Sequence, residues 1–125
     1  MQDLEIYIRD LKPAQLSAWL GQNLDSLNLD DSDVNRSVVK GQASYRGSRV
    51  GVILYPGAFG KRYGSLILEG DELPWATDLE FARNAWRALG TEIRCSTGDW
   101  QEGQPVDEER WWRLDDRGEE QVVWN

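Results

Sequence analysis

The chain of 125 residues has no histidine and only one cysteine, Cys95. Without histidine it lacks the commonest general base of enzymes, the base of most serine and cysteine triads, and the ligand found in most zinc sites. A single cysteine cannot close a disulfide within the chain. Cys95 falls on the same side of a predicted strand as Ile93, so we expect its thiol to be buried and not to act as a nucleophile. We therefore predict a protein without catalytic residues, metal ions or cofactors.

Long apolar runs are also missing. No run approaches the ~20 apolar residues that a helix needs to cross a bilayer, and the first residues do not resemble a secretory signal peptide. Hydrophobic residues make up 40% and charged residues 29% of the chain, an ordinary globular mixture that argues against disorder along the whole chain. We expect one domain over residues 1–125, in the cytoplasm and away from membranes.

Basic residues are outnumbered by acidic ones, 14 against 22, which gives a net charge of −8. This balance argues against nucleic-acid binding, which depends on the neutralisation of phosphates. The charge is also uneven: residues 34–68 contain six basic and no acidic residues, whereas residues 99–120 contain nine acidic and three basic residues. Either the solvated surfaces of two hairpins differ in sign, or one sign is displayed to a partner.

The clearest structural signal lies in residues 75–95. Thr77 and Glu80 stand at the spacing of a capping box, which predicts that a helix begins there. Gly90 stands where a left-handed residue would end this helix, and a strand is predicted at 91–95. We expect Trp75 to pack against the helix. Apolar residues at three- and four-residue spacing predict its buried face: Leu79, Ala82, Trp86 and Leu89, flanked by Phe81 and Ala85.

Alternation and turn residues predict the remaining elements. These are a strand at 4–8, a helix from 13 to about 25, a hairpin of 36–45 and 49–55 around a turn at 46–48, and a strand at 65–69. In the hairpin, Val50, Val52 and Leu54 should face the core. The opposite face should be basic and partly aromatic, with Lys40, Gln42, Ser44, Arg49, Ile53 and Tyr55.

Residues 26–35 are predicted to be a connection between elements. They carry Asp30, Asp31 and Asp33, but the glycine and glutamate of an EF-hand calcium loop are missing from the required positions. We therefore expect no metal site in this segment.

Residues 106–114 fit either a short helix or a strand. The turn-like residues 115–118 and the β-branched pair Val122 and Val123 favour a terminal hairpin. Neighbours in a strand point to opposite faces, so Trp111 and Trp112 should not enter the same core.

The predicted element order is β-α-β-β-β-α-β-β-β. Two helices with one apolar face each should pack on one face of a mostly antiparallel sheet, which defines an α+β fold. The nearest architecture is a ferredoxin-like core with an added C-terminal hairpin, an analogy that carries no function.

Four of the seven tryptophans lie in the acidic last quarter of the chain. Aromatic side chains rimmed by charge are typical anchors of protein interfaces, although a small second core around Trp100 would also explain them. Our first hypothesis is an interaction protein that binds a basic protein partner, a function found among small bacterial inhibitors and immunity proteins. Its predicted binding residues are Trp100, Glu102, Asp107, Glu108, Glu109, Trp111 and Trp112.

A glycine-rich segment at 57–64 supports a second hypothesis. It differs from a phosphate loop because only two residues separate its first glycine from the Gly-Lys pair, and a strand follows instead of a helix. A glycine-rich loop between strands can still hold a small anionic molecule on its backbone N–H groups. The predicted anion-binding residues are Arg49, Gly57, Gly60, Lys61 and Arg62. A third hypothesis is a homodimer in which the basic middle of one copy meets the acidic end of another.

Overall fold

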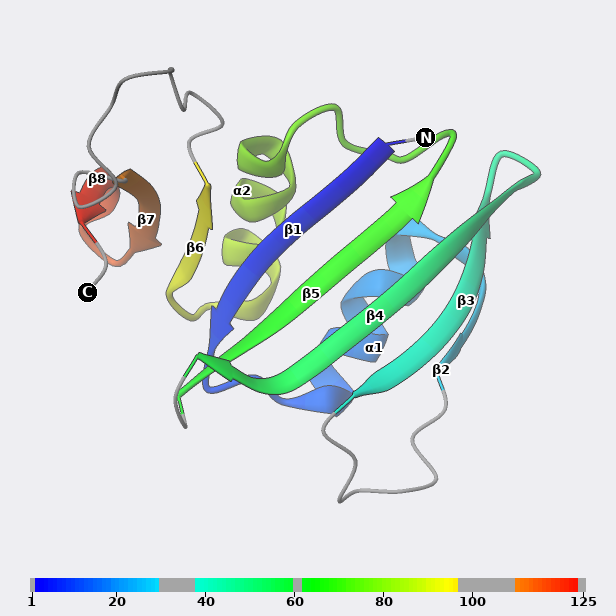
Figure 1. The fold of residues 1–125 in the computed structure, drawn as a ribbon, viewed down its shortest axis with the longest axis horizontal. Helices are drawn as coiled ribbons and strands as arrows, with labels where there is room; N and C mark the ends of the chain where they lie inside the picture. Colours follow the sequence, from blue (N-terminus) through cyan, green and yellow to red (C-terminus); the bar gives the residue numbers. More distant parts are fainter. Residues whose placement is uncertain (1, 30–37, 60–61, 97–109, 124–125) are drawn as a thin grey trace.

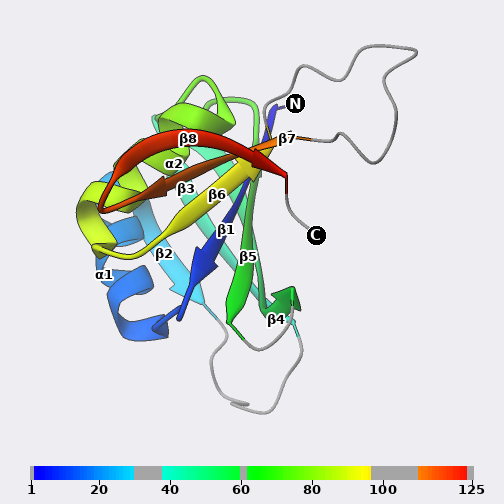
Figure 2. The same cartoon turned by 90° about the vertical axis from the view of Figure 1, so that its left-hand side faces the viewer.

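The computed structural model describes residues 2–29, 38–59, 62–96 and 110–123. Their elements are β1 (Gln2–Arg9), α1 (Pro13–Asn23), β2 (Asp25–Leu29), β3 (Val39–Tyr45), β4 (Ser48–Phe59), β5 (Tyr63–Gly70), α2 (Asp78–Leu89), β6 (Ile93–Ser96), β7 (Arg110–Asp115) and β8 (Gly118–Val123). The strands form one antiparallel sheet in the order β2-β3-β4-β5-β1-β6-β7-β8. Both helices lie on the same face of this sheet (Figures 1 and 2). The predicted α+β class is confirmed.

The centre of the sheet has the order β4-β5-β1-β6. Helix α1 follows β1 and α2 follows β5, the arrangement expected of a ferredoxin-like core. Strands β7 and β8 extend the sheet at one edge as the predicted C-terminal hairpin, with Asp115 paired to Gly118 beside the turn. Residues 110–114 therefore form a strand and not a helix.

At the other edge the structure adds a strand that the sequence did not predict. The connection expected at 26–35 begins with β2, in which the partly buried Leu27 and Leu29 alternate with exposed residues. Strand β2 approaches β3 closely at Gly41, where a Cβ atom would lie 2.6 Å from the carbonyl oxygen of Asn28. Two leucines make too short a pattern for periodicity to reveal a strand. The strand forms because β3 provides backbone hydrogen-bond partners for β2. Asp30, Asp31 and Asp33, where the sequence predicted no metal site, lie outside the described residues.

Helix α2 begins and ends as predicted. The Thr77 side chain accepts a hydrogen bond from the Glu80 backbone N–H at 3.1 Å, and Gly90 ends the helix with φ 67°. The Glu80 carboxylate accepts from the N–H of Ala76 at 2.8 Å instead of the N–H of Thr77. The buried face is centred on Phe81, Ala82 and Ala85, whereas Leu79, Trp86 and Leu89 are only partly buried at its margins.

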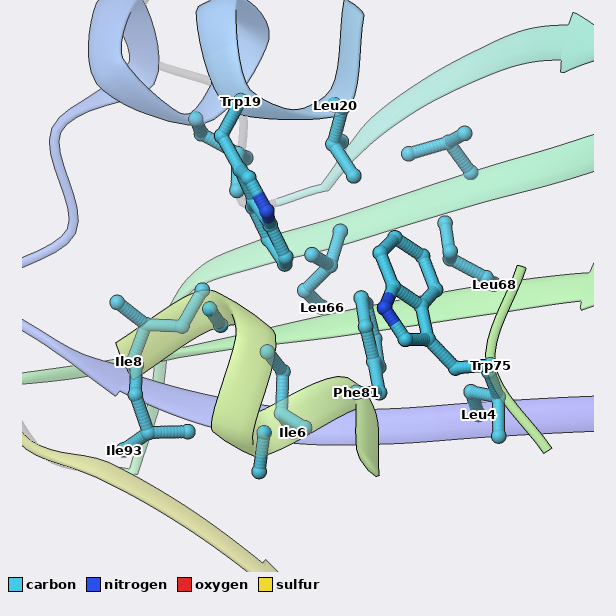
Figure 3. Packing of buried hydrophobic residues seen from close by; sticks show 14 of the residues in the cluster. Leu4, Ile6, Ile8, Trp19, Leu20, Leu66, Leu68, Trp75, Phe81 and Ile93 are labelled. Atoms are coloured by element: carbon cyan, nitrogen blue, oxygen red, sulfur yellow. The ribbon is translucent and has the colours of Figure 1, made fainter. Parts of the chain in front are cut away.

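Three aromatic rings join the two helices in the core (Figure 3). Trp19, Trp75 and Phe81 all contact one another: the ring centroid of Phe81 is 5.5 Å from that of Trp19 and 4.7 Å from that of Trp75, and the two tryptophan centroids are 5.8 Å apart. Trp75 is 7% exposed, so the predicted packing against the helix is confirmed. The indole N–H of Trp19 donates to Oδ1 of Asn84 at 2.6 Å, which satisfies its polar atom.

The β3–β4 hairpin turns in two residues instead of the predicted three. Tyr45 pairs with Ser48, and Arg46 and Gly47 have φ values of 51° and 80°, as a type I′ turn requires. Beyond it the side chains of Val50, Val52 and Leu54 are buried, which confirms their predicted direction.

Candidate functional site

The helices cover only one face of the sheet. Side chains alternate along each strand, so every second residue points to the opposite face, which we call the open face. In the described part of the chain no helix lies over it (Figure 2). The open face is therefore the largest surface on which this fold presents side chains from many strands together.

Half-buried aromatic and aliphatic side chains run across the open face, and we call them the apolar stripe. Ile53 of β4 pairs with Ile67 of β5. The Tyr7 ring of β1 meets the Trp111 ring of β7 edge to face, with centroids 5.5 Å apart. Trp111 pairs in turn with Val122. The stripe also includes Tyr55, so its members are Tyr7, Ile53, Tyr55, Ile67, Trp111 and Val122.

Trp111 and Trp112 point to opposite sides of the sheet, as predicted. Trp111 belongs to the apolar stripe, whereas Trp112 is partly buried against the core on the helix side. The structure therefore separates two of the residues predicted to bind a partner, and only Trp111 lies on the open face.

Three carboxylates lie beside the apolar stripe, and we call them the acid row. Asp3 is directly opposite Glu69 in the β1–β5 ladder, and Glu5 follows two residues after Asp3. Glu5 accepts one long hydrogen bond, at 3.5 Å, from the Ser65 hydroxyl. No lysine or arginine of the described residues forms an ion pair with these three acids. Like charges directly opposite each other in a sheet are destabilising, so Asp3 and Glu69 form an unfavourable cross-strand pair.

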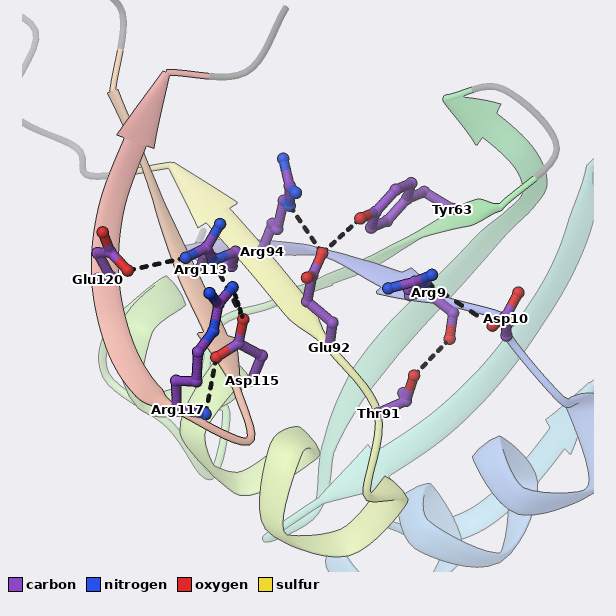
Figure 4. A network of polar contacts seen from close by, with 10 residues as sticks. All are labelled: Arg9, Asp10, Tyr63, Thr91, Glu92, Arg94, Arg113, Asp115, Arg117 and Glu120. Carbon is purple, nitrogen blue, oxygen red and sulfur yellow. Dashed lines mark hydrogen bonds and ion pairs between the residues drawn. The ribbon is translucent and has the colours of Figure 1, made fainter.

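Arginines and carboxylates alternate at the opposite end of the open face (Figure 4). Glu92 accepts hydrogen bonds from the Tyr63 hydroxyl and, at 2.9 Å, from Arg94 Nε. The Arg94 guanidinium also lies 5.2 Å from the centre of the Tyr63 ring. Burial, followed by the hydrogen bond to Glu92, raises the pKa of Tyr63 above its usual value. We call this cluster, with the pairs around Arg113, the arginine network.

Arg113 lies between two acids of the terminal hairpin. Its Nε is 3.2 Å from Asp115 and its terminal nitrogen is 2.8 Å from Glu120. Within the described part of the chain the Nε–H has no hydrogen-bond acceptor in good geometry, despite the short distance. Asp115 also accepts from the backbone N–H and the guanidinium of Arg117. Burial opposes ionisation of Asp115, but the bonds from Arg117 and the charge of Arg113 outweigh it and lower the pKa of Asp115.

The described part of the acidic segment 99–120 is therefore not a surface of unpaired acids. Glu119 likewise binds Arg83 of α2, with an Nε to Oε1 distance of 2.6 Å. The excess negative charge lies elsewhere. The described residues hold 12 basic and 14 acidic side chains, and the remaining residues hold 2 basic and 8 acidic ones. Five predicted partner-binding residues lie outside the described residues: Trp100, Glu102, Asp107, Glu108 and Glu109.

The predicted anion-binding residues that the structure describes, Arg49, Gly57 and Arg62, do not form one site with the glycine-rich segment. Strand β4 continues to Phe59, so Gly57 belongs to a strand and the loop predicted at 57–64 is wrong at that end. Arg49 pairs with Ser44 near the start of β4, eight residues and roughly 27 Å from Gly57 at the rise of a strand. Arg62 is exposed beside β5, and Gly60 and Lys61 lie outside the described residues. The structure thus gives no support to a site that combines Arg49 with this connection.

An open groove of about 940 Å³ lies where the end of β1, the α2–β6 turn and the β7–β8 turn meet. Its walls carry charges of both signs, including Arg9, Arg87, Asp10 and Asp116, beside Trp86. Two further acids of the groove, Glu92 and Asp115, are already bound to arginines. The mixed lining favours no single class of ligand.

The described residues offer little for catalysis or metal binding. Cys95 is fully buried, as predicted, and burial raises the pKa of its thiol to about 12. Among the described side chains no three potential metal ligands lie close enough together to hold an ion. No described helix is both long and apolar enough to span a membrane.

Comparisons of the chain with protein-family models, with curated proteins and with solved structures found no match. The geometry of the open face therefore carries the functional argument. Sequence reasoning placed Lys40 and Ile53 on an outward face and separated Trp111 from Trp112 without saying which one lies outside, but it did not find the acid row. Part of the acid row could be read from the sequence, because alternation in β1 places Glu5 and Tyr7 on one side. Glu69 could not, because only the pairing of β5 with β1 brings it beside them.

Proposed function

We propose that this chain is a protein-interaction domain that binds a basic protein partner through the open face, as an inhibitor or immunity-type protein would. The apolar stripe is the observation that carries this proposal. Aromatic and aliphatic side chains that share an exposed face beyond the core are typical of interaction surfaces, and tyrosine and tryptophan are favoured anchors. The protein acts by occupying its partner and not by chemistry.

Charge supports a basic partner. The chain carries −8 overall, and the acid row places carboxylates without ion pairs next to the apolar stripe. A negative surface chiefly accelerates encounter with a positive partner and selects against acidic ones, and salt weakens both effects.

The proposal is tested by affinity capture from cells of the native host, with the purified chain as bait at low salt. We expect one basic protein to be retained, to be released as salt is raised, and to bind the purified chain directly in isothermal titration calorimetry. The proposal would be contradicted if no such protein were captured, or if the captured partner were acidic and its affinity did not depend on salt concentration.

Two matched variants locate the binding face. Ile67→Lys places a positive charge in the apolar stripe, whereas Gln22→Lys places the same charge on an exposed position of α1 on the other side of the sheet. We expect Ile67→Lys to weaken capture at least tenfold and Gln22→Lys to have little effect, with circular dichroism confirming that both variants fold. The predicted homodimer stays a separate prediction, which light scattering across a salt series tests.

A further inference from the structure

One row of side chains crosses four strands of the open face. Lys40 of β3 pairs with Ile53, Ile53 pairs with Ile67, and Ile67 pairs with Glu5 of β1. Three strand spacings separate its ends, about 14 Å. The row therefore begins with a cation, continues over two isoleucines and ends at a carboxylate.

At the carboxylate end, no acid forms an ion pair with a lysine or arginine of the described residues. Glu5 is followed in the acid row by the opposed pair Asp3 and Glu69. Glu69 is bordered on β4 by Gly51, and a Cβ there would lie 4.0 Å from Oε2 of Glu69, so the missing side chain leaves room for this carboxylate. The acids are too far apart for one metal ion, but long cationic side chains can reach separate carboxylates while their stems cover Ile67.

At the other end of the open face, the arginine network already holds its charges in ion pairs. In the arginine network, Arg94 is bound to Glu92, and Arg113 lies between Asp115 and Glu120. Charges that are already matched give a partner little to gain, so the acid row decides where a cationic partner binds, and Lys40 and the exposed Arg49 limit its position on the side of β3 and β4.

We infer that the basic partner docks on the open face in one orientation, with lysine or arginine side chains over Asp3, Glu5 and Glu69 and apolar side chains on Ile53 and Ile67. This inference rests on the proposed function and names the part of the partner that is recognised: a basic, amphipathic segment. Lys40 bounds the site, because it repels cations that shift toward β3.

The probe is a synthetic 12-residue peptide of alternating lysine and valine, titrated into the ¹⁵N-labelled full chain and followed by NMR, with a glutamate–valine peptide as the control of opposite charge. We expect the lysine peptide alone to shift amides of β1, β4 and β5 around the acid row. Shifts confined to residues 30–37 and 97–109, or to the helix side, would overturn the inference, as would no shift at all.

Charge variants supply the quantitative test. The double variant Asp3→Asn/Glu69→Gln should raise the peptide Kd about threefold to tenfold, whereas Lys40→Gln should lower it about twofold. The matched control Asp116→Asn, in the exposed β7–β8 turn, should change it less than either. Because the double variant removes a like-charge repulsion, its Tm should be unchanged or higher.

Weakening by Asp116→Asn that equals that of the acid-row variant per charge removed would show a general charge effect and refute the inference. The two proposals also fail separately. If the acid-row variant still captures the basic host protein with full affinity, the docking site is wrong while the interaction function stands. If no basic protein is captured by the unaltered chain, the interaction function itself fails.

Discussion

Cys95 shows how burial, more than any other cause, sets the chemistry of a residue. Its side chain lies on the helix side of β6 and is fully buried. Burial first, and then the charges of Asp78 and Glu119, raise the pKa of the thiol from 9.0 to about 12. The folded protein therefore favours the protonated thiol, whereas the unfolded chain releases this proton near pH 9. The thiol contributes its full stability below pH 9 and loses it progressively as the pH rises toward 12.

This linkage predicts a difference between the unaltered chain and Cys95→Ala. Above pH 9 the free energy of unfolding of the unaltered chain should fall faster than that of the variant, by up to about 1.4 kcal/mol per pH unit. Urea unfolding at pH 7.5, 9 and 10 measures both slopes. Parallel slopes in the two proteins would mean that the thiol ionises as easily in the folded chain as in the unfolded one.

Two glycines give a matched test of backbone conformation. A Cβ atom would meet no other atom within 4 Å at either Gly47 or Gly21, so packing does not distinguish them. Gly47 has φ 80° in the β3–β4 turn, whereas Gly21 lies inside helix α1. We expect Gly47→Ala to destabilise the protein by about 1–2 kcal/mol and Gly21→Ala to stabilise it by about 0.5–1 kcal/mol. Chemical denaturation measures both, and a shared sign would contradict this reading of the two positions.

At the scale of elements, the two helices differ in how their ends are stabilised. Lys12 precedes α1 without a side-chain cap, and α1 has no acid in its first turn. Helix α2 has the Thr77 cap, acids in its first turn and Arg87 in its last, which agrees with its helix dipole. More of the stability of α1 must therefore come from its buried residues, such as Leu16 and Leu20.

The Thr77 cap is open to direct measurement. Thr77→Ala removes the acceptor for the Glu80 N–H and should lower the free energy of unfolding by about 1 kcal/mol. Thr77→Ser keeps the hydroxyl and should stay within a few tenths of a kcal/mol of the unaltered chain. Equal losses in the two variants would show that the methyl group, and not the hydrogen bond, is responsible.

Strand β4 shows why element lengths are harder to predict than element types. Proline and glycine at positions 56 and 57 favour the end of a strand, and the sequence placed that end at residue 55. The strand continues because Phe59 pairs with Tyr63 of β5, with a register shift after Tyr55 that accommodates the interruption. The pairing strand, which local pattern does not include, decides the boundary.

For the whole molecule, the terminal hairpin is part of the same folding unit as the rest. Leu114 of β7 belongs to one buried cluster with Ile93 and Leu20, and Glu119 of β8 binds Arg83 of α2. A chain with one continuous core should unfold in a single cooperative transition.

Fluorine NMR of protein labelled with 5-fluorotryptophan tests this unity. Trp112 reports on the hairpin and Trp19 on the helix layer, so their signals should disappear at the same urea concentration. An earlier midpoint for Trp112 would show that the hairpin melts independently, and the assignment follows from Trp112→Phe and Trp19→Phe variants.

The sequence by itself determined the local features of this protein. The capping box at Thr77, the alternation in β1 and the inward direction of Val50 depend on contacts within a few residues, so short patterns specify them. Only the tertiary structure decided β2, the arginine pairing of the hairpin acids, and the row from Lys40 to Glu5. Each of these depends on strand register between segments far apart in the chain, and register is fixed by the fit of the whole core and not by any one segment.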